Sequence, residues 1–137
     1  MKTLLLYYSF TGNTRRFAEK LASETGAELF ALKDAKPLSK LRAFTSGVVA
    51  AMRQKPANLH PFSANLPAYD KIIIAMPIWA GHPAPPIHNI LAQLPAGKEV
   101  ELYMLSGSGH SGGSAEKIKA LVTANGCTVT GYHDIKA

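Results

Sequence analysis

Residues 3–14 read TLLLYYSFTGNT, an unbroken apolar run that gives way abruptly to a glycine and a cluster of polar side chains. A continuous apolar run ended by turn residues is typical of a β-strand that is buried on both faces of a parallel sheet. The pattern then becomes helical from Asn13 to Thr25, and Gly26 supplies a stop. One polar residue is enough to cap a helix, so the density of hydroxyls at this turn favours a bound ligand.

The alternation of strand and helix patterns continues along the chain. An α/β order of this kind predicts one domain, residues 1–137, with a doubly wound parallel sheet and helices on both faces. Pro77 is expected to end the third strand, and residues 82–86 are expected to form a loop and a first helical turn. Strands are expected at 3–9, 27–33, 70–76, 99–105 and 127–132, and helices at 13–25, 38–52, 87–94 and 111–125.

The composition is that of a globular chain with an uneven distribution of charge. The 137 residues are 47% hydrophobic and 18% charged, and the net charge is +6. Much of the positive charge lies between Lys33 and Lys55, which suits an acidic partner or a nicotinamide phosphate, with a merely solvated helix face as the alternative. This stretch has neither zinc-finger spacing nor an aromatic RNA-binding signature, so nucleic acid is not expected.

Neither a membrane span nor a disulfide is expected. No apolar run approaches the roughly 20 residues that cross a bilayer. The polar cluster at 9–14 interrupts the N-terminal apolar stretch too early for a signal peptide. Cys127 is the only cysteine in the sequence, so an internal disulfide and a cysteine-based metal site are excluded. These observations predict a cytoplasmic protein.

Three loops that leave strand ends are unusually rich in glycine, hydroxyl or aromatic residues. They read SFTGNT at 9–14, PIWAGHP at 77–83 and SGSGHSGGS at 106–114. In a parallel sheet of this kind, ligands bind beyond the carboxyl ends of the strands. The three loops therefore predict a single site at one edge of the sheet.

The first loop has the chemistry of a phosphate cradle. A helix N-terminus offers unpaired N–H groups and the positive end of the helix dipole, and Gly12 lets the backbone approach a ligand closely. The loop lacks the lysine of a GxxxxGK[ST] motif, and no metal-binding aspartate ends the third strand. This combination favours a phosphate that is held rather than transferred. An elaborate helix cap without a ligand is the alternative. The polar side chains of the cradle are those of Ser9, Thr11, Asn13 and Thr14.

These motifs resemble those of the flavodoxin-like proteins. Residues 9–14 are similar to the [ST]-x-T-G-x-T loop that holds the FMN phosphate in that family, and residues 77–81 to its second, flavin-contacting loop. The resemblance covers the chain and implies a five-stranded sheet in the order 2-1-3-4-5 with FMN bound non-covalently. FMN is expected rather than FAD, because 137 residues leave no second domain for an AMP half. The cofactor-binding residues that this implies are Ser9, Phe10, Thr11, Gly12, Asn13, Thr14, Pro77, Ile78, Trp79, Ala80, Gly81, His82, Ser106, Gly107, Ser108, Gly109, His110 and Gly112.

Trp79 and the later loops also fit a flavin ring by their own chemistry. Trp79 follows a strand end, so its indole can stack on a planar tricycle, with packing into the core as the alternative. Backbone amides at 80–81 and 107–109 can reach the polar edge of the ring. His82 and His110 flank the same edge, and either can equally be a surface histidine.

Three features differ from the electron carriers of the family. Those carriers usually cover the flavin with an aromatic residue of the third loop and are acidic, whereas residues 106–114 contain no aromatic residue and this chain is basic. Residues 38–55 also form an unusual basic segment. The differences favour an oxidoreductase that passes electrons from NAD(P)H to a small acceptor such as a quinone. The alternative is a non-enzymatic electron carrier that docks on a redox partner.

A second phosphate-binding pattern is less well supported. Residues 107–112 spell GxGxxG between a strand and a helix, and Asp134 follows about twenty residues later, as in a dinucleotide-binding fingerprint. This unit has no following strands to complete such a site, so dinucleotide binding there is the weaker interpretation. A response regulator is excluded, because Met76 and Pro77 stand where its phospho-accepting aspartate would end the third strand.

Overall fold

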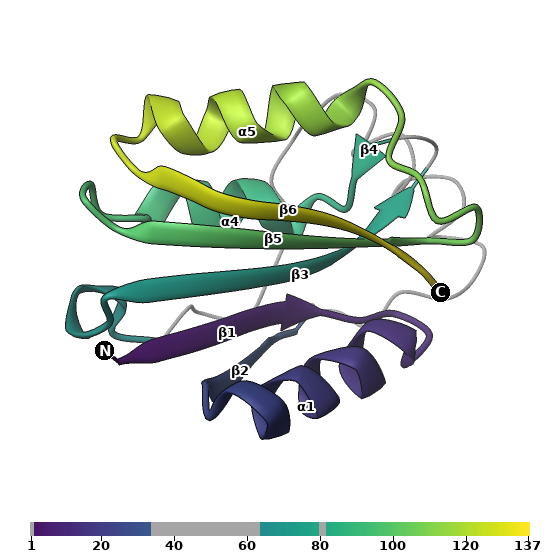
Figure 1. Cartoon of the computed structure of the whole chain (residues 1–137), viewed down its shortest axis with the longest axis horizontal. Coiled ribbons are helices and arrows are strands. Elements are labelled where there is room, and N and C mark those ends of the chain that lie inside the picture. Colours follow the sequence, from purple (N-terminus) through teal and green to yellow (C-terminus); the bar gives the residue numbers. More distant parts are fainter. Residues whose placement is uncertain (1, 34–63, 80–81) are drawn as a thin grey trace.

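The computed structural model describes residues 2–33, 64–79 and 82–137, with a β-sheet of parallel main strands at its centre (Figure 1). The main strands stand in the order β2-β1-β3-β5-β6, and the short β4 pairs with β3 outside this row. When β4 is left out, this is the order 2-1-3-4-5, so the predicted sheet is confirmed. The strands are β1 (Thr3–Tyr8), β2 (Glu28–Leu32), β3 (Lys71–Trp79), β4 (His82–Pro83), β5 (Glu99–Ser106) and β6 (Thr128–Lys136).

Helices cover both faces of the sheet. The helix α1 (Asn13–Thr25) lies on one face, α4 (Pro86–Gln93) and α5 (Ser114–Ala124) lie on the other, and the 3-10 helix η2 (Leu66–Ala68) precedes β3. Ala18 of α1 packs with Ile73 of β3, whereas Ile118 of α5 packs with Ile74 on the opposite face. The central strands are thus buried on both sides, which explains why they appear in the sequence as continuous apolar runs.

β3 continues past Pro77, the residue that was expected to end it. Pro77 pairs in register with Leu105 of β5, while β1 pairs with β3 only as far as Ala75, so no ladder hydrogen bond is needed from the proline nitrogen. The Pro77 carbonyl accepts the Ala84 N–H at 2.9 Å. The chain turns back so that Trp79 stands opposite His82, and residues 82–83 form β4 instead of the expected loop.

The last strand and the last helix also differ from expectation. β6 pairs with β5 as far as Lys136, with one register shift between Val100 and Glu101, and so extends well beyond the expected end at Tyr132. His133, the first residue after the expected end, contacts Glu101 across the sheet. α5 begins at Ser114 rather than Ser111, since Gly112 takes a left-handed φ of 61° that interrupts the helix.

The expected helix at 38–52 and nearly all of the basic stretch 33–55 lie outside the described residues. Among the helices that the structure describes, none is long and apolar enough to cross a membrane.

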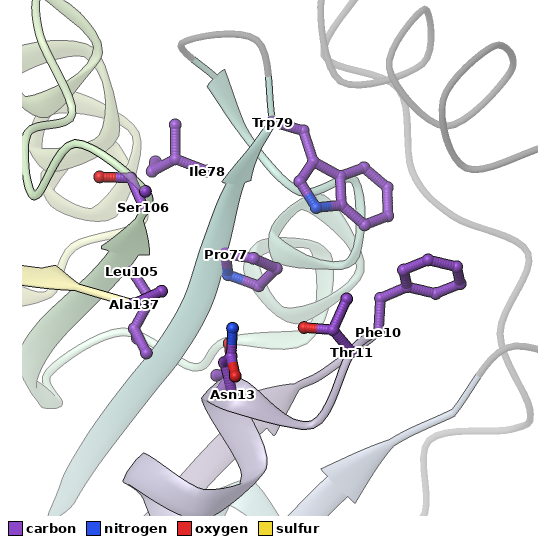
Figure 2. A pocket seen from close by; sticks show the side chains of 11 residues that line it. Phe10, Thr11, Asn13, Pro77, Ile78, Trp79, Leu105, Ser106 and Ala137 are labelled. Carbon is purple, nitrogen blue, oxygen red and sulfur yellow. The ribbon is translucent and has the colours of Figure 1, made fainter. Parts of the chain in front are cut away.

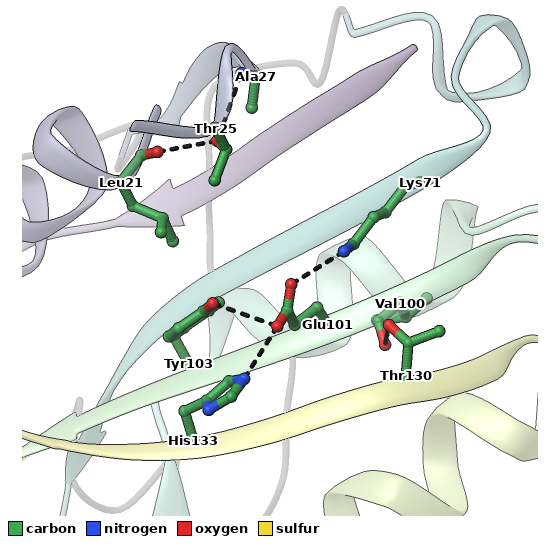
Figure 3. A network of polar contacts seen from close by, with 9 residues as sticks. All are labelled: Leu21, Thr25, Ala27, Lys71, Val100, Glu101, Tyr103, Thr130 and His133. Carbon is green, nitrogen blue, oxygen red and sulfur yellow. Dashed lines mark hydrogen bonds and ion pairs between the residues drawn. The ribbon is translucent and has the colours of Figure 1, made fainter. Parts of the chain in front are cut away.

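A polar network lies on the α1 face of the sheet, across β3, β5 and β6 (Figure 3). The Glu101 carboxylate lies 3.0 Å from Lys71 Nζ and 2.9 Å from His133 Nε2, and it accepts the Tyr103 hydroxyl at 3.2 Å. Gly131 leaves room for this arrangement, because a Cβ there would lie 3.0 Å from His133 Nε2. Burial of the Glu101 carboxyl works to raise its pKa, but hydrogen bonds from Lys71 and His133 outweigh this and hold the pKa below its usual value.

Replacing Glu101 with glutamine is expected to lower the free energy of unfolding at neutral pH by about 1 kcal/mol, because charge-assisted hydrogen bonds are lost. The Glu101 pKa is lower in the folded than in the unfolded state. Its stabilisation is therefore complete above the ordinary glutamate pKa and disappears as the pH falls through the folded-state value. Urea unfolding at a series of acidic pH values should show the difference between wild type and Glu101→Gln shrinking. A difference that is independent of pH would contradict this role.

Candidate functional site

The carboxyl ends of β1, β3 and β5 meet around a cavity of about 140 Å³. Figure 2 shows Trp79 and Phe10 on one side of β3 and Leu105 and Ser106 on the other. Small-molecule pockets commonly measure about 300–1,000 Å³, so this cavity holds part of a ligand rather than all of it. The expected convergence of three distant loops is present. The lining residues are Phe10, Thr11, Asn13, Thr14, Pro77, Ile78, Trp79, Leu105, Ser106, Gly107 and Ala137.

The turn between β1 and α1 leaves the N-terminus of the helix open. Gly12 takes a left-handed φ of 98°, which glycine adopts without strain, and its N–H donates to Ser9 Oγ at 3.0 Å. Gly12 is also the N-cap of α1, and no side chain of the described residues caps this helix. The hydroxyl cluster therefore does not serve as the helix cap that was the alternative interpretation.

Two threonines of this turn line the cavity without an internal hydrogen-bond partner. Thr11 is exposed and Thr14 is only 3% exposed, and neither hydroxyl bonds to another residue in the described part of the chain. Asn13 completes the turn, and its Oδ1 accepts a hydrogen bond from Arg16. The two free hydroxyls beside an open helix N-terminus match what an anionic ligand requires.

Trp79 is held at the rim of the cavity by the hairpin of β3 and β4. Its indole is partly buried and meets the rings of Tyr8 and Phe10 edge-on, with centroid distances of 6.0 and 6.2 Å. Edge-to-face packing of this kind fixes an aromatic ring in orientation. Figure 2 shows the indole above Thr11. Trp79 therefore joins the core at one edge and lines the cavity as well.

The loop after β5 contributes Ser106 and Gly107 to the cavity, and its remainder folds on itself. Ser106 Oγ accepts the Gly109 N–H at 3.0 Å and donates to the His110 carbonyl at 3.2 Å. His82 stands opposite Trp79 in the hairpin and does not line the cavity. The predicted residues Ala80 and Gly81 lie outside the described residues. The other predicted residues that do not line the cavity are Ser9, Gly12, Ser108, Gly109, His110 and Gly112.

The family model for flavodoxin matches residues 2–127 of this chain. This chain belongs to the flavodoxin family. A search among curated proteins found no match.

Solved structures of flavoproteins align with nearly the whole chain. A flavoprotein from Lactobacillus acidophilus NCFM in complex with FMN is 27% identical, with a TM-score of 0.78 over 98% of this chain and 92% of that one. A flavoprotein, described as putative, from Bacteroides eggerthii DSM 20697 is 28% identical, with a TM-score of 0.82 over 96% and 86% of the two chains. A WrbA-like flavodoxin protein from Agrobacterium tumefaciens shares the fold at 22% identity, with a TM-score of 0.61 over 93% and 74%.

Three residues at this flavodoxin-family site were not predicted from the sequence. Leu105 is the buried end of β5, and Ala137 reaches the cavity because β6 is longer than expected; its N–H donates to the Ser106 carbonyl at 2.8 Å. Arg16 lies over the first turn, since its Nη1 would stand 3.3 Å from a Cβ at Gly12. Its place one helical turn after Gly12 was the available signal. None of the described side chains that line the cavity is charged, so Arg16 adds positive charge from the side.

Proposed function

We propose that this flavodoxin-family protein binds FMN non-covalently at the edge formed by β1, β3 and β5. The observation that carries the proposal is the pair of hydroxyls, Thr11 and Thr14, which have no hydrogen-bond partner among the described residues and lie at the open N-terminus of α1. A phosphate there would accept hydrogen bonds from both hydroxyls and from the first N–H groups of the helix. Arg16 would add electrostatic attraction. The Lactobacillus acidophilus relative, whose structure is a complex with FMN, supports this assignment.

The residues above the phosphate turn fit the ring of the cofactor. Trp79 offers an aromatic surface, while Pro77 and Leu105 offer apolar contact and Ser106 a polar one. When bound, FMN supplies reversible uptake of one or two electrons, and the protein supplies binding and orientation. The cavity that the described residues bound is smaller than the whole cofactor, so part of FMN would lie outside it.

The function that the site favours is that of an oxidoreductase passing electrons from NAD(P)H to a small acceptor such as a quinone. The side of the cavity away from Trp79 is lined by Leu105, Ser106 and Ala137 (Figure 2), and among the described residues no aromatic side chain lines it there. A ring that is covered on one side leaves its other side to a nicotinamide or a quinone. The second candidate is an electron carrier that docks on a redox partner, which the net charge of +6 would assist.

Turnover without a partner protein separates these two functions. The FMN-loaded protein should oxidise NADH or NADPH steadily when only a quinone is supplied, because both substrates would reach the uncovered side of the ring. Absorbance of the nicotinamide measures this rate, and the same concentration of free FMN is the control. A rate no higher than that of free FMN, with fast turnover only after a reductase is added, would favour the carrier.

A further inference from the structure

A buried hydroxyl ties the loop after β5 to β6. Ser111 is 2% exposed, and its Oγ lies 2.6 Å from the Tyr132 hydroxyl and within hydrogen-bonding distance of Asp134 Oδ1. A carboxylate only accepts hydrogen bonds, so Ser111 donates to Asp134 and its oxygen accepts from Tyr132. The three groups form one directed chain in which every proton has an acceptor. Such chains rigidify their surroundings when every member is satisfied.

Tyr132, at one end of this hydrogen-bonded chain, is held by further contacts. Burial raises the pKa of its hydroxyl above the ordinary value, against an opposing effect of the hydrogen bond with Ser111. The hydroxyl therefore stays protonated at neutral pH and remains a donor. Lys119 Nζ of α5 lies 5.3 Å from the centre of the Tyr132 ring, which is within the range of a cation–π contact.

Ser111 lies between the start of α5 and the part of the loop that lines the cavity. Its carbonyl accepts the Ser114 hydroxyl at 2.7 Å, which sets the first residue of α5. On its other side, Ser106 closes the turn that contains Gly109 and His110. The peptide bond between His110 and Ser111 joins this turn to the anchored residue, and Ser106 at the start of the turn lines the cavity. A displacement of Ser111 would loosen these turns and the cavity wall that they form.

We propose that Tyr132 and Asp134, acting through Ser111, are positioning residues that hold the loop at 106–113 in the conformation that receives the flavin ring. This inference rests on the proposed FMN site. It also accounts for the GxGxxG pattern at 107–112 followed by Asp134, which resembles a dinucleotide fingerprint in the sequence. Asp134, the acidic residue of the pattern, accepts a hydrogen bond from Ser111 of the same loop. The pattern therefore indicates a loop that is anchored to β6.

Hydrogen exchange of the cofactor-free protein tests the anchor alone. Asp134→Ala and Tyr132→Phe each remove one end of the chain and should speed amide exchange at Gly109 and His110 by roughly tenfold, while β3 and β5 keep their protection. Glu24→Ala is the matched control, because it removes the same charge from a side chain that is 59% exposed near the end of α1, on the other face of the sheet. Unchanged loop exchange in both variants would overturn the anchor.

Flavin titrations of the same variants test the positioning role. The loop lies on the ring side of the site, so both variants should weaken FMN and riboflavin by the same factor, roughly three- to tenfold, the equivalent of one hydrogen bond. Asp134→Asn keeps an oxygen that accepts from Ser111 and should retain most of the affinity. The variant that combines Asp134→Ala with Tyr132→Phe should lose no more flavin affinity than Ser111→Ala does. This is the result expected for two residues that act through a third.

The outcomes distinguish this inference from the function on which it rests. Variants that bind both flavins as tightly as the wild type would overturn the positioning role and leave the FMN site intact. A wild-type protein that binds neither flavin would refute the FMN site, and the positioning role with it.

Discussion

Replacing Thr11 and Thr14 together with valine is expected to weaken FMN binding by roughly 10²- to 10⁴-fold. Each charge-assisted hydrogen bond to a phosphate contributes about 1.5–3 kcal/mol, and valine removes the hydroxyl while keeping the shape of the side chain. The shape matters most at Thr14, which is only 3% exposed. Quenching of flavin fluorescence during titration of the cofactor-free protein measures the loss.

Riboflavin separates loss of a phosphate site from general damage. It has no phosphate, so the double variant should bind it as the wild type does. Thr123→Val is the matched protein control, because the Thr123 hydroxyl bonds only within α5, to the carbonyls of Lys119 and Ala120. A double variant that loses riboflavin as severely as FMN would mean that the turn has a structural role only.

Replacing Trp79 with alanine is expected to weaken FMN and riboflavin equally, by about 1–3 kcal/mol, which is the usual effect of losing one aromatic stacking partner. The ring is common to both flavins, so the phosphate should make no difference here. Trp79→Phe keeps an aromatic face and should recover part of the affinity. Titrations of the three proteins with both flavins measure these losses.

The alternative role of Trp79 is packing, because its ring meets Tyr8 and Phe10 edge-on. Thermal unfolding of the cofactor-free variants distinguishes the two roles. A Trp79→Ala protein that is less stable but binds both flavins with wild-type affinity would contradict the stacking role and leave Trp79 as a core residue.

The fold and the location of the site could be predicted because they depend on local patterns. The apolar runs of β1 and β3 are continuous since helices cover both faces of the sheet. Parallel strands bring their carboxyl ends to one edge, so the loops that begin at Ser9, Pro77 and Ser106 could be assigned to one site before any distance was known.

The features that the sequence did not predict depend on partners far along the chain. His133 and Asp134 lie beyond the expected end of the last strand, and their partners are Glu101 on β5 and Ser111 in the loop after it. Pro77 is normally a strand terminator, but it lies in β3 where the ladder with β1 has already ended. Local composition carries no information about such pairings.

Whether the protein carries FMN is tested most directly by identifying the flavin that heat releases from the purified, cofactor-loaded chain. Chromatography against FMN, FAD and riboflavin standards gives the identity, and absorbance gives the amount. We expect FMN, at one molecule per chain after incubation with an excess. FAD as the retained flavin, or a chain that retains no FMN after that incubation, would contradict the proposed site.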